Sequence, residues 1–446
     1  NAMGLLLFVV LDPVDKFWKS SPLNMISLKV YVDDFALSFR FNRNVHTTDL
    51  MRMRVANSYR TLETAILGEG SNFAKGKGKI ITSDSKVGEA IADELNNGSD
   101  TRRSITNESQ IAILGVDYAA GRPIDYTKMK ERLKCANAKA AKINALTKGG
   151  WRALNIMRAH VVTAVTYSAR VNGVPNPILD RLRTIVRSAT STRAKGGSAT
   201  MDLMLQRPKY ADPLYDATIL PAMEWVIRVN VAAYNKDDNT LKKHANAWYN
   251  AVAWLYTISQ QTDPWTKING PAAACILSLL RVKWSPATRE GWKIWQDRDG
   301  NEIDITECPP HTIKQWLRSD IQKHLWDTSS VNELGDSSGV WLAPLRAAVL
   351  SCKDPVIGAA TRSVAINTQW TQQRVANAGY ADIDDNKCRL CNASVGSLTH
   401  RNSHCGCPKL REQCNLWVDS KTRHYIDTAV ERQEPHEETA LLVAHG

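Results

Sequence analysis

The sequence has no apolar run long enough to cross a bilayer. Its longest candidate, MGLLLFVVL (Met3 to Leu11), is far shorter than the roughly 20 residues that a membrane helix needs. It also lacks the basic start and the small-residue cleavage site of a secretion signal. We therefore expect a soluble intracellular protein with no membrane partner.

Acidic residues are scarce between positions 125 and 200. That segment holds 15 Lys and Arg against three acids (Asp125, Glu131 and Asp180), a net charge of +12. The whole chain, with 57 Lys and Arg against 45 Asp and Glu, also has a net charge of +12, so this one segment equals the entire excess. A basic region this one-sided attracts phosphate backbones. The alternative interpretation is a solvated basic face with no ligand.

Cysteine is sparse over most of the chain and crowded near its end. Four of the nine cysteines are isolated before position 388, and the other five lie between 388 and 414. An odd number of cysteines without a secretion signal argues against a disulfide framework, whereas crowding favours a metal site.

The crowded segment fits a zinc-ligand pattern. It reads C-x2-C-x8-H-x4-C and supplies Cys388, Cys391, His400 and Cys405. Three thiolates and an imidazole suit a structural Zn²⁺ with four protein ligands. His404 or Cys407 could replace Cys405 as the fourth ligand, because spacing does not distinguish them.

Two adjacent aspartates stand between strand-forming runs in SLKVYVDDFALSF (Ser27 to Phe39). The runs LKVYV and FALSF predict a hairpin with Asp33 and Asp34 at its tip. Adjacent carboxylates repel each other, and a divalent cation with a preference for oxygen ligands offsets that repulsion. Two-metal phosphoryl transfer with Mg²⁺ uses carboxylates mounted in this way. The alternative is a surface turn with two solvated acids.

The pattern that follows the hairpin predicts an α+β module. It contains a helix over Asp49 to Gly70, a strand over Lys79 to Thr82, a second helix, and a strand over Ala112 to Tyr118. From 125 onward the pattern is helical, with breaks at 171–177 and 194–200 that favour a bundle.

These residues in this order resemble the reverse transcriptases of non-LTR retrotransposons. The resemblance rests on YVDD between apolar strands, on the helix followed by GKGKIITS, on ILGV, on the lysine-rich helices and on the late Cys/His cluster. It implies an RNA-directed DNA polymerase that uses Mg²⁺, deoxynucleoside triphosphates, an RNA template, and a DNA primer or target DNA. It also implies a nuclear or cytoplasmic ribonucleoprotein.

The resemblance also implies roles for individual residues. Asp33 would bind metal directly with Asp34 as its partner, and Tyr31 would lie near the primer terminus. Lys77, or Lys75 or Lys79 with a small shift, would lie near the incoming triphosphate. Leu114 and Gly115 would sit at the primer-gripping element, and the helices from 125 would form the thumb.

The family's third metal-binding carboxylate has no clear counterpart here. Only 32 residues precede Asp33, and Asp12 is separated from it by just 20, which leaves no room for the family's intervening loop and long helix. We therefore expect a C-terminal portion of a polymerase, without the first metal-binding aspartate and the fingers, and inactive by itself. The alternative is a non-catalytic nucleic-acid-binding protein that uses its basic helices and its zinc module.

The expected fold is α+β, a partial polymerase palm followed by mainly helical regions. A hairpin is also expected around Asp299 and Gly300. The tryptophans of this region are expected to pack a core, with base stacking as the alternative; they stand at positions 248, 254, 265, 284, 292, 295, 316 and 326. The expected organisation is a partial palm at 1–124, a basic thumb-like region at 125–260, a Trp-rich connection at 261–380, a zinc module at 381–420 and an acidic disordered tail at 421–446.

Overall fold

The computed structural model is mixed α+β and mostly helical, which confirms the coarse fold class. Its contacts divide the chain into two compact units, one of residues 1–128 and 266–269 and the other of residues 129–265 and 270–446. The structure describes residues 26–31, 34–39, 41, 46–68, 76–97, 104–120, 124–148, 154–190, 198–206, 211–258, 263–286, 290–329, 346–347, 349, 352, 354–366, 371–379, 386–397, 400 and 405–408.

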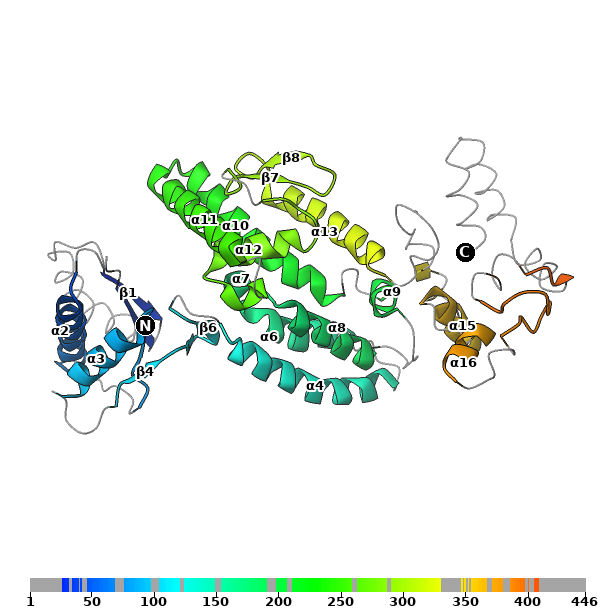
Figure 1. Cartoon of the computed structure of the whole chain (residues 1–446), viewed down its shortest axis with the longest axis horizontal. Coiled ribbons are helices and arrows are strands. Elements are labelled where there is room, and N and C mark those ends of the chain that lie inside the picture. The colour runs from blue at the N-terminus through cyan, green and yellow to red at the C-terminus, as the bar shows by residue number, and fades with distance from the viewer. Residues whose placement is uncertain are drawn as a thin grey trace. The chain divides into compact units, whose positions relative to one another are not determined.

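The first unit opens with the predicted hairpin. Strands β1 (Ile26–Tyr31) and β2 (Asp34–Phe39) pair antiparallel in a register that sets Tyr31 opposite Asp34. Their alternating apolar side chains are typical of strands. The hairpin prediction is confirmed, and β1 and β2 are visible in Figure 1.

Two helices follow and pack on each other. Helix α2 (Thr48–Gly68) covers nearly the predicted range. Helix α3 (Ser85–Asn96) begins after Asp84, whose carboxylate accepts a hydrogen bond from the backbone N–H of Lys86, an N-cap that supplies a partner for an otherwise unpaired donor. A small core of Ala56, Ile91, Leu95 and Ile105 lies between them.

Helix α3 links two parallel strands. Strand β3 (Lys79–Ile81) pairs with β4 (Thr106–Glu108) in parallel, the arrangement that requires a crossover helix. The amide of Asn96 fixes the approach to β4, since it donates to the carbonyl of Ile105 and accepts from the N–H of the same residue.

The predicted single strand over Ala112 to Tyr118 is wrong. The structure has two short strands instead, β5 (Ile111–Ile113) and β6 (Val116–Tyr118), paired antiparallel. Leu114 and Gly115 form the turn between them, with φ of 50° and 74°. Two consecutive positive φ values define the tight turn that matches strand twist, and glycine at only one of the two positions made the turn hard to recognise in the sequence.

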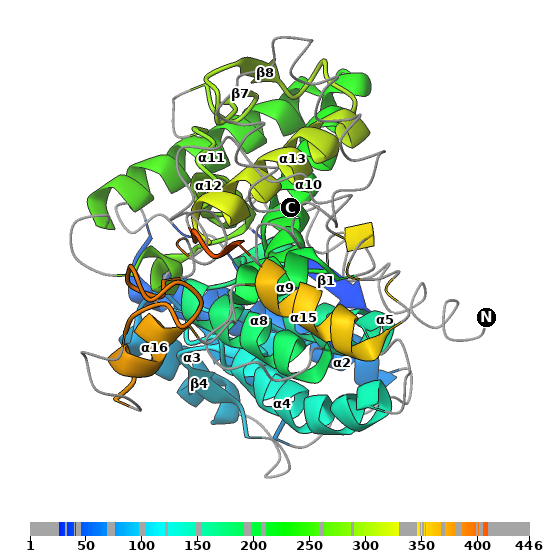
Figure 2. The same ribbon diagram turned by 90° about the vertical axis from the view of Figure 1, so that its right-hand side faces the viewer.

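In its described residues, the second unit is a set of packed helices with a hairpin of two short strands (Figures 1 and 2). The break predicted at 171–177 covers the end of α7 (Ala169–Asn172), the link that follows it and the start of α8 (Asn176–Thr190). Within the described residues, no helix is both long and apolar enough to span a membrane. The elements up to the hairpin are α4 (Thr127–Lys148), α5 (Leu154–Met157), the π-helix η1 (Arg158–Val162), α6 (Thr163–Val165), the 3-10 helix η2 (Thr166–Ser168), α7 (Ala169–Asn172), α8 (Asn176–Thr190), α9 (Ala199–Met204), α10 (Pro213–Tyr234), α11 (Asp238–Ile258), the 3-10 helix η3 (Pro264–Lys267) and α12 (Pro271–Leu280).

Tryptophans form much of this unit's core, as predicted. Trp248, Trp284 and Trp295 are fully or almost fully buried, and Trp295 contacts both of the others through ring centroids 6.2 to 6.4 Å apart. Trp225, which the sequence did not single out, joins them with its ring centroid 4.9 Å from that of Trp248. Trp254 and Trp316 depart from the prediction because they are 38% and 43% exposed.

The predicted hairpin near Asp299 and Gly300 is confirmed. Strands β7 (Ile294–Gln296) and β8 (Glu302–Asp304) pair antiparallel. The carboxylate of Asp297 accepts hydrogen bonds from the N–H groups of Asp299 and Asn301, and Gly300 has a φ of 87°. The turn therefore depends on one acid and one glycine.

Buried ion pairs join the later helices to the bundle. Asp202 on α9 is almost completely buried. It accepts hydrogen bonds from Arg187 on α8 and from Arg362 on α15 (Pro355–Ala365). The later described helices are α13 (Pro310–Asp327), α15 (Pro355–Ala365) and α16 (Gln372–Asn377). The predicted acidic tail at 421–446 lies outside the described residues.

Candidate metal centre and basic surface

Cys388, Cys391, His400 and Cys405 come together in space. Their ligand atoms all lie within 4.8 Å of one another, so the cluster could hold a metal ion. The Sγ atoms of Cys388 and Cys405 are 3.9 Å apart, and Sγ of Cys391 lies 3.1 Å from Nε2 of His400. Three sulfurs and one imidazole nitrogen this close match the donor set of a four-coordinate structural zinc site.

Backbone hydrogen bonds shape the loop that carries the first two cysteines. Lys387 and Val395 form a bridge, and the N–H of Cys388 donates to the carbonyl of Ser394. Asn392 has a φ of 52°, and its N–H donates to the carbonyl of Cys388. The tight turn therefore holds Cys388 and Cys391 on one side, as a C-x2-C pair requires.

Helix α16 (Gln372–Asn377) contacts this loop at Gly396. The N–H of Gln373 donates to the carbonyl of Gly396, and a Cβ at Gly396 would lie only 2.8 Å from Oε1 of Gln372. His400 is oriented by its own N–H, which donates to Oγ of Ser397. Contacts of this kind orient first-sphere ligands and restrict the ways in which a loop can collapse.

The local environment lowers the pKa of two of the thiols. The N–H of Ala393 is the largest influence on Cys391 and lowers its pKa. Burial raises the pKa of Cys388, but the N–H groups of Leu390 and Cys391 outweigh it, and the net shift is downward. Deprotonated thiols are the form that binds metal.

The pKa of the third thiol, Cys405, is shifted upward. The N–H of Cys407 lowers the pKa of Cys405, but desolvation and the thiols of Cys388 and Cys391 outweigh it and raise the pKa. Three thiolates in one small volume repel each other, and a divalent cation would remove that repulsion. Of the alternative ligands, Cys407 is half-buried and outside the set, and His404 lies outside the described residues.

The aspartate pair is only partly described. Asp33 lies outside the described residues, and the structure places Asp34 in the first position of β2 without a described side chain. Tyr31, the last residue of β1, is its partner in the register. The predicted Mg²⁺ site therefore stays a prediction.

The predicted nucleotide-contacting lysines precede and begin β3. Lys77 is exposed in the approach to the strand, directly after Gly76 with its φ of 66°. Lys79 opens the strand and forms an ion pair of 3.5 Å with Glu108 on β4. Lys75 lies outside the described residues. Leu114 and Gly115 form the tip of the β5–β6 hairpin, with Leu114 42% exposed.

Several arginines of the basic segment have acidic partners that the sequence window did not include. Arg183 donates through Nε to both carboxylate oxygens of Asp212 at 2.9 to 3.0 Å. Arg187 pairs with Asp202 at 3.2 Å. Arg158 and Arg170 lie 3.8 Å and 3.0 Å from Asp216 and Glu224. All four acids follow position 200, so the field of this segment is weaker than its own composition indicates.

The lysines of α4 form the exposed basic surface. Lys134, Lys139 and Lys142 are exposed on this helix, while Met129, Leu133 and Ala140 are buried on its opposite side. Within the described residues, none of these three lysines has an ion pair. We call Lys134, Lys139 and Lys142 the α4 lysine face.

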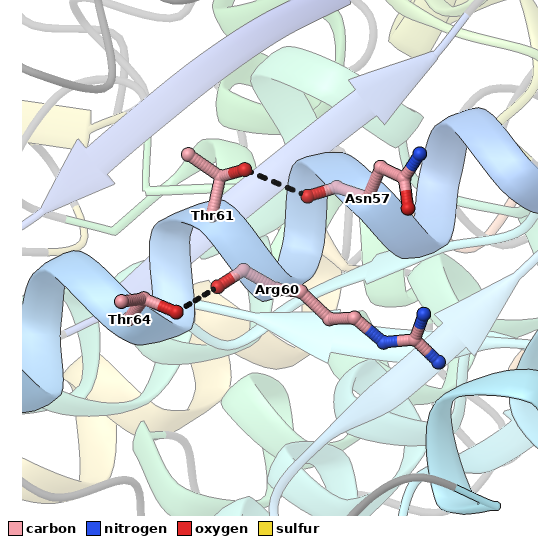
Figure 3. Close-up of a pocket in the computed structure, with 4 residues that line it drawn as sticks. All are labelled: Asn57, Arg60, Thr61 and Thr64. Carbon is pink, nitrogen blue, oxygen red and sulfur yellow. Dashed lines mark hydrogen bonds between the residues drawn. The ribbon is translucent and has the colours of Figure 1, made fainter.

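A surface depression of about 390 Å³ on α2 does not look like an active site (Figure 3). It is lined by Asn57, Arg60, Thr61 and Thr64. Both threonine hydroxyls donate to backbone carbonyls one turn earlier, and Arg60 pairs with Glu94 at 3.1 Å. The two hydroxyls and the guanidinium group therefore already have partners within the protein, and the depression does not combine side chains that could carry out a reaction.

No known protein family, curated protein or solved structure matches the chain.

Proposed function

We propose that this chain is the nucleic-acid-binding and partial palm portion of an RNA-directed DNA polymerase of the non-LTR retrotransposon type. In this proposal the α4 lysine face binds the phosphate backbone of a template–primer duplex. The Cys/His cluster holds a structural Zn²⁺. Asp33 and Asp34 are two of the carboxylates of a Mg²⁺ site.

The register of the first hairpin carries the polymerase part of the proposal. Tyr31 pairs with Asp34 at the end of the ladder, so the sequence YVDD occupies the point where β1 turns into β2. A short turn between two paired strands mounts carboxylates on a rigid base, which two-metal phosphoryl transfer requires.

The α4 lysine face supports the binding part. Three exposed lysines on one helix present charge, and none of them forms an ion pair within the described residues. Long flexible ammonium groups bind phosphates as point charges. Because Arg183 and Arg187 of α8 are paired with buried acids, they offer little charge to a ligand, whereas the lysines of the α4 lysine face are exposed.

Zinc fits the metal-binding cluster better than the hard cations do. The donors are three sulfurs and one imidazole nitrogen, whereas Mg²⁺ and Ca²⁺ take oxygen ligands. With four protein ligands there is no open position for a substrate, so zinc would stabilise the loop and take no part in a reaction.

A second candidate function is non-catalytic nucleic-acid binding. The observation that favours it is that the described basic and metal-binding features need neither aspartate. In this case Asp33 and Asp34 would be solvated acids without a role.

Nucleotide incorporation and duplex binding test the proposal together. We expect the chain to bind an RNA–DNA hybrid in a salt-sensitive way but not to extend the primer with Mg²⁺, because we identify only two of the three carboxylates in its sequence. Equilibrium binding by fluorescence anisotropy and a primer-extension assay measure these properties.

The outcomes separate the two candidates. Binding that is strengthened by Mg²⁺ in the wild type, and not in Asp33→Asn, supports a metal site at the hairpin. Equal Mg²⁺ dependence of both proteins favours the non-catalytic candidate. Primer extension that is lost in Asp33→Ala would show that the chain is a complete enzyme, and no hybrid binding at low salt would refute both candidates.

A further inference from the structure

Three elements of the second unit bring cationic side chains to one carboxylate. Asp327 is the last residue of α13, and its Oδ2 atom forms an ion pair with Arg298 in the turn between β7 and β8. The same oxygen lies 3.5 Å from Nζ of Lys283, which follows α12. Figures 1 and 2 show the two strands beside α13. Two cations therefore share one acid, and their positive charge exceeds its negative charge.

Two other acids on the same hairpin and helix already have a different cation as partner. Asp299, next to Arg298, lies 2.9 Å from Nζ of Lys323, and Asp320 lies 3.4 Å from the same atom. Asp320 also accepts a hydrogen bond from the indole N–H of Trp284. Lys323 thus offsets part of the charge of these acids, and neither of them forms an ion pair with Arg298 within the described residues.

Two buried nitrogen atoms next to Asp327 have no hydrogen-bond partner. They are Nη1 of Arg298 and Nδ1 of His324, and neither forms a hydrogen bond within the described residues. His324 precedes Asp327 by three residues, which places both on one side of α13. A buried guanidinium N–H is costly unless a water molecule or an ion meets it. The two atoms therefore indicate the position of a polar ligand.

The charges near His324 favour an anion at this position. Burial is the main cause that lowers the pKa of His324, and Arg298, Lys283 and Arg281 lower it further. Asp327 acts in the opposite direction. Because three cations and one carboxylate influence this imidazole, an anion placed beside it gains more electrostatic free energy than a neutral water molecule does.

Lys283 occupies a backbone position that normally favours glycine. Its φ is 66°, its N–H donates to the carbonyl of Leu280, and the N–H of Trp284 donates to that of Leu279. This hydrogen-bond pattern ends many helices, usually with glycine in the left-handed conformation. The side chain of Lys283 is 60% exposed, against 17% for that of Arg298, so solvent has access from the lysine side.

We propose that Arg298, His324 and Lys283 bind a phosphate group. Its oxygens accept hydrogen bonds from Nη1 of Arg298 and, in the tautomer that carries a proton there, from Nδ1 of His324. Nζ of Lys283 meets the phosphate from the solvent side. Because Arg298 is only 17% exposed, free phosphate or the terminal phosphate of a nucleic acid fits better than a phosphodiester within a strand. This site shares no residue with the α4 lysine face and does not depend on the proposed polymerase function.

Glycine at position 283 tests the site without weakening the fold. Lys283→Gly should not lower the melting temperature in phosphate-free buffer, because glycine adopts a positive φ without strain. It should weaken the binding of inorganic phosphate by about 10-fold, the effect expected for a lost charge-assisted hydrogen bond. Isothermal titration calorimetry of the full chain at constant ionic strength measures this affinity.

Lys236→Gly is the matched control. Lys236 is also an exposed lysine with a positive φ, of 53°, so this variant should keep the wild-type affinity for phosphate. Equal phosphate affinity in the wild type and Lys283→Gly would overturn the proposal. The absence of saturable phosphate binding would also overturn it, because water molecules would then suffice for the two buried atoms.

Two oligothymidylates, one with a 5′-phosphate and one with a 5′-hydroxyl, distinguish the sources of the phosphate group. Tighter binding of the phosphorylated strand that is lost in Lys283→Gly assigns the site to a nucleic-acid end. Equal binding of both strands, together with saturable binding of inorganic phosphate, assigns it to free phosphate. Binding of the RNA–DNA hybrid should be the same in the wild type and both lysine variants, so failure of the proposed function would leave this result unchanged.

Discussion

At the scale of single residues, His324 on α13 has an unfavourable environment for its charged form. Burial is the main cause that holds its pKa below the ordinary value of 6.5, and Arg298 acts in the same direction. Asp327 opposes this shift without reversing it. Nδ1 of His324 is buried and has no hydrogen-bond partner, so a proton added there gains no compensating contact within the described residues.

The free energy of unfolding should therefore depend on pH through this side chain. Because the unfolded chain binds the proton more readily, the stability that neutral His324 contributes is present above pH 6.5 and is lost as pH falls toward the lower folded pKa. One proton limits the slope to about 1.4 kcal/mol per pH unit. Urea unfolding between pH 5 and 7.5 should show a shallower slope for His324→Gln.

His311→Gln, at an exposed position on the same helix, is the matched control and should keep the wild-type slope. His244 also has a lowered pKa, caused first by burial, so part of the slope should survive in His324→Gln. An unchanged slope in His324→Gln would contradict this account of the buried imidazole.

At the scale of elements, the metal-binding loop is short and has little core of its own. Cys388 and Cys405 are buried, but Leu390 and Val395 are 43% and 42% exposed. A segment that buries so little apolar surface would gain much of its stability from a metal bound to the Cys/His cluster. The contact with α16 through Gly396 would then depend on the same metal.

Loss of the metal should loosen this segment. Cys388→Ser/Cys391→Ser should reduce zinc from about one ion per chain to nearly none, and limited proteolysis should cut the loop and α16 faster. Atomic absorption measures the zinc, and mass spectrometry locates the cuts. Cys135→Ser, on the exposed surface of α4, is the control, and undiminished zinc in the double variant would refute the site.

The elements also show what a sequence can and cannot reveal. Helix α2, the first hairpin and the Cys/His set were predictable because period, turn residues and ligand spacing are local signals. The β5–β6 turn was missed because Leu114 adopts a positive φ that its residue type does not favour. The parallel pairing of β3 with β4 depends on contacts across a whole helix, which no local pattern encodes.

At the scale of the whole molecule, arginine and lysine have different roles. Arginines at 183, 187 and 362 hold buried carboxylates between helices, while lysines on α4 face solvent. The charge count over residues 125–200 could not distinguish paired arginines from exposed lysines, because the acidic partners of the arginines follow position 200. The positive charge that this segment exposes is therefore smaller than its composition indicates, and the α4 lysine face carries part of it.

This division predicts opposite effects for two sets of variants. Lys134→Gln/Lys139→Gln/Lys142→Gln should leave the melting temperature unchanged but weaken hybrid binding and reduce its salt slope by up to about 3. Arg183→Gln should lower stability by about 3 to 5 kcal/mol, because Asp212 would stay buried and unpaired. Calorimetry and anisotropy measure the two effects, and a destabilised lysine variant with wild-type binding would contradict this assignment.

The order in which the chain is synthesised matters for Asp202, the buried aspartate on α9. Its partners Arg187 and Arg362 lie 15 and 160 residues away along the chain. At about 5 to 20 residues per second, Arg362 is made roughly 8 to 32 seconds after Asp202, whereas Arg187 is already present when Asp202 is made. Arg187 is therefore available to pair with the Asp202 carboxylate while the chain is still being made. Arg362 can pair with Asp202, and so join α15 to α9, only after translation has passed residue 362.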